Sequence, residues 1–135
     1  MEARPRVLVC DDSLGFPTLV QTWLRDDGRF DVIGLVKTGT QARDAVEAER
    51  PDLIVLDLLL PDSPDPADLV RRLREAHPPL RVLMVSSLHP EALEDAGRAA
   101  GADGVCNKGA AAAELAERLY AIASGEGSST QNRLP

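Results

Sequence analysis

Residues 53–61 read LIVLDLLLP, and this stretch decides the fold. Its first four residues are large and aliphatic, which is typical of a strand buried on both faces of a parallel sheet. The run ends at Asp57, and prolines at positions 61, 64 and 66 indicate a loop behind it. A charge directly after a buried strand lies at the carboxyl edge of the predicted sheet, where open α/β sheets bind their ligands.

The same alternation of short apolar runs and longer amphipathic segments extends in both directions. It predicts strands at residues 6–10, 30–36, 53–57, 81–85 and 103–107. It predicts helices up to about residue 27 and over residues 38–50, 66–76, 90–100 and 110–124. Five βα units in about 125 residues predict a flavodoxin-like (βα)5 fold, an α/β doubly wound parallel sheet with strand order 2-1-3-4-5.

Local signals place several helix ends. Asp12 or Ser13 is a candidate cap for the first helix, and Pro17 fits only in its first turn, where no backbone donor is needed. Gly28 is expected to end this helix. The third helix is predicted to begin after Asp65, which is followed by a proline at the first helical position.

Composition narrows the class of protein. The net charge is −7, so we expect no direct contact with nucleic acid and none with an anionic membrane surface. No apolar run is long enough to span a membrane, and the polar N-terminus does not resemble a signal peptide. We expect residues 5–126 to form one domain and residues 127–135 to be a disordered tail or the start of a linker.

The two cysteines, Cys10 and Cys106, lie in the first and fifth predicted strands. In the predicted strand order these strands are roughly 14 Å apart, which is too far for a disulfide. We therefore expect two buried, reduced thiols and a cytoplasmic protein.

The predicted topology brings five polar side chains to one edge of the sheet. Asp11 and Asp12 follow the first strand, Asp57 ends the third, Ser86 follows the fourth and Lys108 follows the fifth. Taken singly, Asp12 is more often a helix cap, Ser86 a turn residue and Lys108 a solvated charge. Together they place three carboxylates, a hydroxyl and an ammonium group at a single site.

This combination suits phosphoryl transfer. Asp57 can supply the nucleophile, Lys108 a positive charge and Ser86 a donor to a phosphoryl oxygen. Carboxylates this close repel one another unless a cation lies among them, and all-oxygen ligands favour Mg²⁺. For direct metal ligation we favour Asp12 and Asp57, with Asp11 close behind or bridging through water, and the backbone carbonyl of Leu59 completing the shell.

The chain resembles the receiver domain of bacterial response regulators over residues 5–126. The motifs that carry this resemblance are VLVCDDS, LIVLDLLLP, VLMVSS, GADGV and CNKG. The resemblance implies that Asp57 accepts phosphate from a sensor histidine kinase and that Asp11 and Asp12 form the acidic metal pair. It also implies that Ser86 is the switch hydroxyl and Lys108 the phosphate-contacting lysine. Residues 32–36 and 122–126 look similar to DNA-binding LuxR/NarL-type regulators, and residues 82–88 to chemotaxis methylesterases.

The family switches a surface formed by its fourth helix, fifth strand and fifth helix, which a second copy or an output domain would read. Val105 occupies the position where the family often has an aromatic residue that swings inward as the hydroxyl residue moves, so this part of the readout is expected to be missing here. Leu59 and Leu88 replace residues that are often polar, so we expect a long-lived aspartyl phosphate. Gly109 follows the lysine where proline is frequent, and the Asp65-proline pair replaces a glycine, which predicts a stiffer loop.

Two other readings use the same residues. A phosphatase of the haloacid dehalogenase type also combines aspartates, serine, lysine and Mg²⁺, but its nucleophile lies in a D-x-D motif after the first strand. Here the acidic pair comes first, and Asp57 begins no D-x-D motif. The second reading is a receiver-like interaction module with attenuated or phosphorylation-independent switching. We favour the phosphoacceptor, which is not an enzyme beyond slow self-dephosphorylation.

Overall fold

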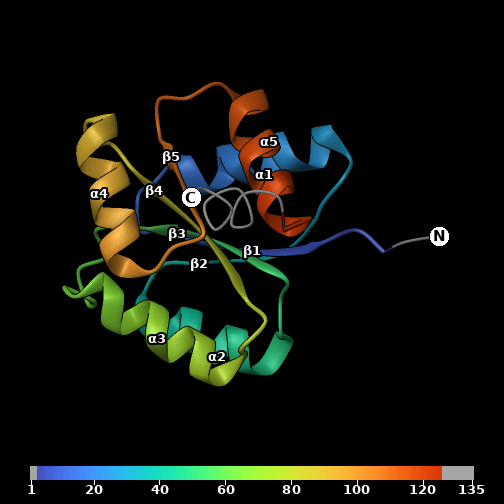
Figure 1. Ribbon diagram of the computed structural model, residues 1–135. Helices are drawn as coiled ribbons and strands as arrows, with labels where there is room; N and C mark the ends of the chain where they lie inside the picture. Colours follow the sequence, from blue (N-terminus) through green and yellow to red (C-terminus); the bar gives the residue numbers. More distant parts are fainter. Residues whose placement is uncertain (1–2, 126–135) are drawn as a thin grey trace.

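Five strands and five helices alternate along residues 3–125, the part of the chain that the computed structural model describes (Figure 1). The strands form one parallel sheet in the order β2-β1-β3-β4-β5, so the predicted fold class and strand order are confirmed. The elements are β1 (Arg6–Cys10), α1 (Phe16–Asp27), β2 (Asp31–Val36), α2 (Gly39–Glu49), β3 (Leu53–Asp57), α3 (Pro66–Ala76), β4 (Arg81–Ser86), α4 (Pro90–Ala100), β5 (Gly104–Asn107) and α5 (Ala112–Ala123).

Helices cover both faces of the sheet, and each face has its own aliphatic core. Helices α2, α3 and α4 pack against one face, and α1 and α5 pack against the other (Figure 1). Every residue of β3 is buried, as its uninterrupted apolar sequence predicts. Cys10 belongs to the first core and Cys106 to the second, and both are unpaired and buried, as predicted.

The start of α1 differs from the prediction. Pro17 lies in the first turn and Gly28 ends the helix with a φ of 84°, both as expected. However, the helix begins at Phe16, and no side chain caps it. Ser13 instead donates its backbone N–H and its hydroxyl to Asp11 Oδ1, at 2.8 and 2.5 Å. The predicted cap at Asp12 or Ser13 is wrong because this loop folds around the buried Asp11 carboxylate.

Several other boundaries shift by one or two residues, among them the starts of β5 and α5. The strand β5 begins after Asp103, whose carboxylate accepts a hydrogen bond from Val82 N at 2.7 Å and pairs with Arg74 Nη2 at 2.6 Å. Helix α5 is shorter than predicted, because Ala110 N first donates to Asn107 O in a turn. The predicted tail at 127–135 lies outside the described residues. Of the helices described, none is long and apolar enough to cross a membrane.

Candidate functional site

The carboxyl ends of four parallel strands meet at one edge of the sheet. Asp57 ends β3 and Ser86 ends β4, while Asp11 directly follows β1 and Lys108 directly follows β5. The backbone N–H of Lys108 donates to the Ser86 carbonyl at 2.9 Å, so the β4–β5 pairing fixes where the lysine side chain starts. The sheet thus brings together residues that are up to 97 positions apart in the chain.

Lys108 connects the carboxylates of this edge. Its Nζ lies 2.7 Å from Asp11 Oδ2 and 3.6 Å from Asp57 Oδ2. The same ammonium group lies over the ring of Phe16, 5.1 Å from its centroid. Because Asp11 is completely buried and Asp57 is only 7% exposed, this pairing is screened much less than a surface ion pair.

Asp11, Asp12 and Asp57 form a compact oxygen cluster. Each offers one carboxylate oxygen, and these three atoms lie within 4.8 Å of one another. Asp12 is exposed and the other two are buried, so the cluster opens to solvent on one side. The buried Asp11 Oδ2 forms an ion pair with Lys108 but accepts no hydrogen bond of good geometry. This all-oxygen set, with an incompletely satisfied buried anion, fits a hard divalent cation such as Mg²⁺.

The environment of Asp57 disfavours its charge. Burial raises the pKa of the Asp57 carboxyl above its ordinary value, and the neighbouring charges of Asp11 and Asp12 raise it further. A hydrogen bond from Leu59 N to Asp57 Oδ1, at 3.2 Å, and the charge of Lys108 lower the pKa in part. The net direction is upward, so additional positive charge at this edge would stabilise the ionised form of Asp57.

Ser86 is 2% exposed, and its hydroxyl is part of a short chain of hydrogen bonds. Its Oγ accepts from Leu88 N at 3.2 Å, and the Leu88 carbonyl accepts from Asn107 Nδ2 at 2.8 Å. Asn107 Oδ1 accepts in turn from Gly109 N at 2.7 Å. Asn107 thereby ties the end of β5 to the loop after β4. Asn107 was not among the predicted site residues, although its position directly before Lys108 places it at the same edge of the sheet.

The loop after Asp57 is held by a second residue that the sequence analysis missed. Asp62 accepts hydrogen bonds from Gly39 N at 2.8 Å and Thr40 N at 3.2 Å, at the start of α2. These bonds lower the pKa of Asp62. The side chain of Leu59 in the same loop is 64% exposed beside the site.

Val105 lies half-buried in β5, close to α4. A Cβ atom added to Gly97 of α4 would be 2.3 Å from Val105 Cγ1, so helix and strand are in direct contact here. The Val105 carbonyl accepts from Arg118 Nη1 of α5 at 2.9 Å. Val105 therefore links α4 and α5 in the surface expected to switch.

Residues 7–120 match the response regulator receiver domain. The chain belongs to this family. TcrX, a transcriptional regulatory protein of Mycobacterium tuberculosis, is 36% identical over 118 residues, which cover 86% of this chain and 48% of TcrX. Protein-glutamate methylesterase/protein-glutamine glutaminase 1 of Methanospirillum hungatei is 39% identical over 94 residues, which cover 70% of this chain and 27% of the relative.

Solved receiver structures agree with this assignment. The signal receiver domain of NarL from Mycobacterium tuberculosis matches with a TM-score of 0.80 and 28% identity, covering 92% of this chain and 99% of that one. The response regulator domain of Thermotoga maritima CheB shares the fold, with a TM-score of 0.73 and 24% identity over 98% of this chain and all of that one. The receiver spans at most about half the length of the curated relatives above. Its general function is switching by phosphorylation in two-component signalling.

Proposed function

We propose that Asp57 accepts the phosphoryl group from a phosphohistidine of a sensor histidine kinase. A carboxylate oxygen of Asp57 bonds to phosphorus while the phosphorus–nitrogen bond breaks, and the imidazole nitrogen keeps the electron pair. The observation that carries this proposal is the Lys108 ammonium between Asp11 and Asp57, because it places positive charge beside the nucleophile. The receiver unit is proposed to comprise residues 5–126.

Mg²⁺ is the proposed cofactor. The carboxylates of Asp11, Asp12 and Asp57 would hold it, together with the backbone carbonyl of Leu59. When bound, the ion neutralises charge on the phosphoryl oxygens. Lys108 supplies a second positive charge and keeps Asp11 and Asp57 close together in the metal-free protein.

The proposed switch begins at Ser86. A hydroxyl can donate one hydrogen bond while accepting another, so Ser86 Oγ can bond a phosphoryl oxygen and still accept from Leu88 N. Moving this hydroxyl displaces Leu88, and the bond from Asn107 to the Leu88 carbonyl carries the displacement to β5. This displacement shifts the surface of α4, β5 and α5 from one of two conformations toward the other. A second copy or an output domain binds one conformation in preference to the other.

Apolar side chains beside the acidic edge support docking of a phosphodonor protein. Leu14 is 95% exposed in the loop after Asp11, and Leu19 is half-exposed on α1. Replacing Leu14 with serine should slow transfer from the kinase several-fold and leave transfer from a small acyl phosphate unchanged. Equal slowing with both donors would contradict a docking role.

The direct test is acyl phosphate labelling of the protein and of Asp57→Asn. The substitution keeps the size of the side chain but removes the nucleophile, so the label should disappear. Asp44→Asn is the matched control, because it changes an exposed carboxyl on helix α2 and should label normally. Equal labelling of Asp57→Asn and the unchanged protein would overturn the assignment.

The protein is proposed to act as a phosphoacceptor and not as a turnover enzyme, apart from slow loss of its own phosphate. A reducing cytoplasm is the proposed location, supported by the two unpaired thiols. Burial raises the pKa of Cys10 to about 12, so this thiol stays protonated and inert at neutral pH.

The packing of Val105 on Gly97 favours a second candidate, an interaction module with attenuated switching. The small side chain already fills its place against α4 and has no large ring to reorient. Mg²⁺ with beryllofluoride, a mimic of the phosphoryl group, distinguishes the two. Amide resonances near Ser86, Lys108 and Val105 should all shift in a working switch, whereas the attenuated module should leave those near Val105 unchanged.

A further inference from the structure

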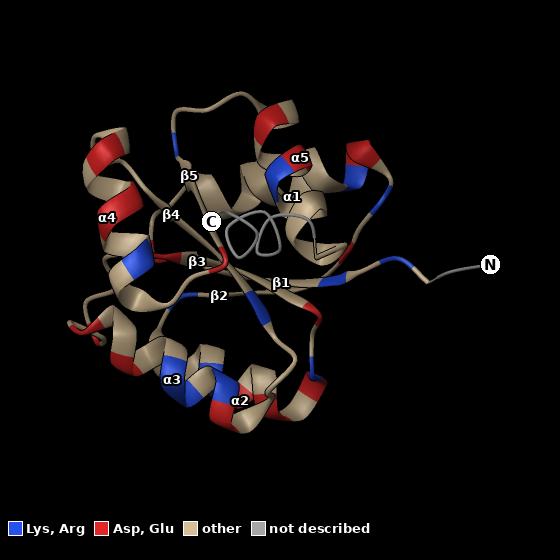
Figure 2. Ribbon diagram, viewed as in Figure 1, with Lys and Arg blue, Asp and Glu red and all other residues tan. Residues whose placement is uncertain are grey.

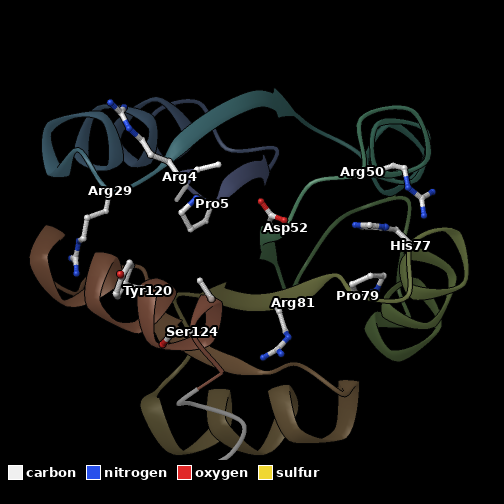
Figure 3. Close-up of a pocket in the computed structure, with 12 residues that line it drawn as sticks. Arg4, Pro5, Arg29, Arg50, Asp52, His77, Pro79, Arg81, Tyr120 and Ser124 are labelled. Carbon is white, nitrogen blue, oxygen red and sulfur yellow. The ribbon is translucent and has the colours of Figure 1, made fainter. Parts of the chain in front are cut away.

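A second polar cavity lies at the opposite edge of the sheet, where the strands begin. It has a volume of about 650 Å³, and four arginines line it: Arg4, Arg29, Arg50 and Arg81. Among its described lining residues, Asp52 is the single acidic one. Figure 3 shows these side chains around the opening, with His77 and Arg50 on one side and Arg29 on the other.

The concentration of positive charge is unusual for this chain. Four of its 15 basic residues line one cavity, although the net charge of the protein is −7. The chain leading into β1 is blue in Figure 2, whereas the far end of β3 is red. Arg81 begins β4 and Arg50 lies shortly before β3, so guanidinium groups gather at this edge, although β2 begins with an aspartate, Asp31.

The guanidinium groups of the cavity differ in how many ion-pair and hydrogen-bond partners they already have. Arg29 is held by Asp27 and Glu117, at 2.7 and 2.8 Å. Arg50 donates to the Ala76 carbonyl at 3.3 Å, and within residues 3–125 it has no carboxylate at ion-pair distance. A guanidinium carries five N–H donors, so Arg50 keeps donors for a ligand in the cavity.

His77 provides an independent indication of a ligand. It follows the last residue of α3 and is only 9% exposed, yet its Nδ1 has no hydrogen-bond partner in the described structure. Figure 3 shows its ring reaching toward the middle of the cavity. Buried polar atoms are nearly always satisfied, so an unused imidazole nitrogen at a basic cavity indicates that a polar partner completes the site.

We propose that this cavity binds a small phosphorylated anion, independently of the phosphoacceptor site. Arginine forks match phosphate oxygens in pairs, and Arg50 lies near His77 because it donates to the carbonyl of the preceding residue, Ala76. The volume accommodates a mononucleotide, and Tyr120 adds an aromatic ring to the lining. The five residues of β3 separate this edge from Asp57 by roughly 17 Å, so both sites can be filled at once.

The test is backbone amide NMR of the whole chain, without Mg²⁺, titrated with pyrophosphate and, separately, with adenosine monophosphate. Saturable shifts should centre on residues 50–52, 77–81 and 120–124. Tighter binding of pyrophosphate would assign the site to inorganic phosphates, and tighter binding of the nucleotide would assign it to nucleotides. Adenosine is the uncharged control, and adenosine binding as tight as that of the monophosphate would overturn phosphate recognition.

Matched variants locate the site. Arg50→Gln should weaken binding about tenfold, because it removes charge-assisted hydrogen bonds. Arg43→Gln, on α2 but outside the cavity, should leave binding unchanged. His77→Phe keeps the ring packing and should also weaken binding, whereas Asp57→Asn should not. Equal effects of Arg50→Gln and Arg43→Gln, shifts centred on Asp57 and Lys108, or the absence of saturable shifts would each overturn the proposal.

Discussion

The two edges of the sheet hold their charged side chains in different ways. At the carboxyl edge, Lys108 lies 2.7 Å from Asp11, which is fully buried. At the amino edge, Arg29 lies 2.8 Å from Glu117, whose side chain is 69% exposed. The distances are nearly equal, but burial makes the first interaction strong and leaves the second screened by solvent. Burial, more than contact distance, therefore distinguishes the ion pair at the acidic edge from the ion pair beside the arginine cavity.

The largest expected effect comes from removing the buried cation. Lys108→Met should slow phosphoryl labelling about 100-fold, as loss of one charge that stabilises a transition state does. Without Mg²⁺ it should also lower the free energy of unfolding by about 2–3 kcal/mol, because Asp11 loses its buried partner. Denaturant titrations and labelling time courses measure the two effects.

Lys37→Met is the matched control for this prediction. Lys37 is the other lysine of the chain, and it follows β2 at the same edge but is exposed. It should change neither the labelling rate nor the unfolding free energy measurably. Similar losses in both variants would remove the distinction between buried and exposed charge at this edge.

A smaller effect is expected at the exposed Leu59. Leu59→Gln should shorten the half-life of the aspartyl phosphate several-fold, because an amide beside Asp57 can orient a hydrolytic water. Decay of the labelled protein in Mg²⁺ buffer measures the half-life. A half-life of seconds in the unchanged protein would already contradict the expected slow hydrolysis.

A pH profile tests the raised pKa of Asp57. The folded protein holds the Asp57 proton more tightly than the unfolded chain, so this proton stabilises the fold most below the ordinary pKa of 3.8. That stabilisation is lost as pH rises through the raised folded pKa. Asp57→Asn does not titrate, so without Mg²⁺ its melting temperature should exceed that of the unchanged protein by an amount that grows as pH rises above 3.8 and levels off above the raised folded pKa. A constant difference across this range would show that the pKa is not raised.

The smallest effect is expected at the amino edge. Glu117→Gln should change the free energy of unfolding by less than about 0.5 kcal/mol, because its ion pair with Arg29 is exposed. It should also tighten pyrophosphate binding about twofold, since one competing carboxylate is gone. A loss of stability as large as that of Lys108→Met would abolish the contrast between the two edges.

Much of the fold and of the acidic site follows from the sequence because parallel strands impose a simple rule. The apolar run 53–56 must be buried, so Asp57 has to emerge at the carboxyl edge. The same reasoning placed Asp11, Ser86 and Lys108 there, and the structure brings these side chains to that edge. The proposed roles of these residues and of the Leu59 carbonyl remain predictions.

Only the tertiary structure decided which polar groups are shared between distant segments. Ser13 has the side chain of a helix cap, yet it bonds to Asp11, because a buried carboxylate needs donors more than an exposed helix end does. Asp62 accepts a hydrogen bond from the start of α2, and Asn107 donates one to the loop after β4. Both bonds depend on how the loops fold, which no local sequence pattern predicts.

The arginine cavity has the same origin. Arg4, Arg29, Arg50 and Arg81 share no motif, and only the common starting edge of the strands and the ends of the helices gathers them. The sequence by itself determined the parallel sheet and its acidic edge, because burial and strand direction are properties of short segments. The tertiary structure decided the hydrogen-bond partners and the second cavity, because these depend on how segments far apart in the chain meet.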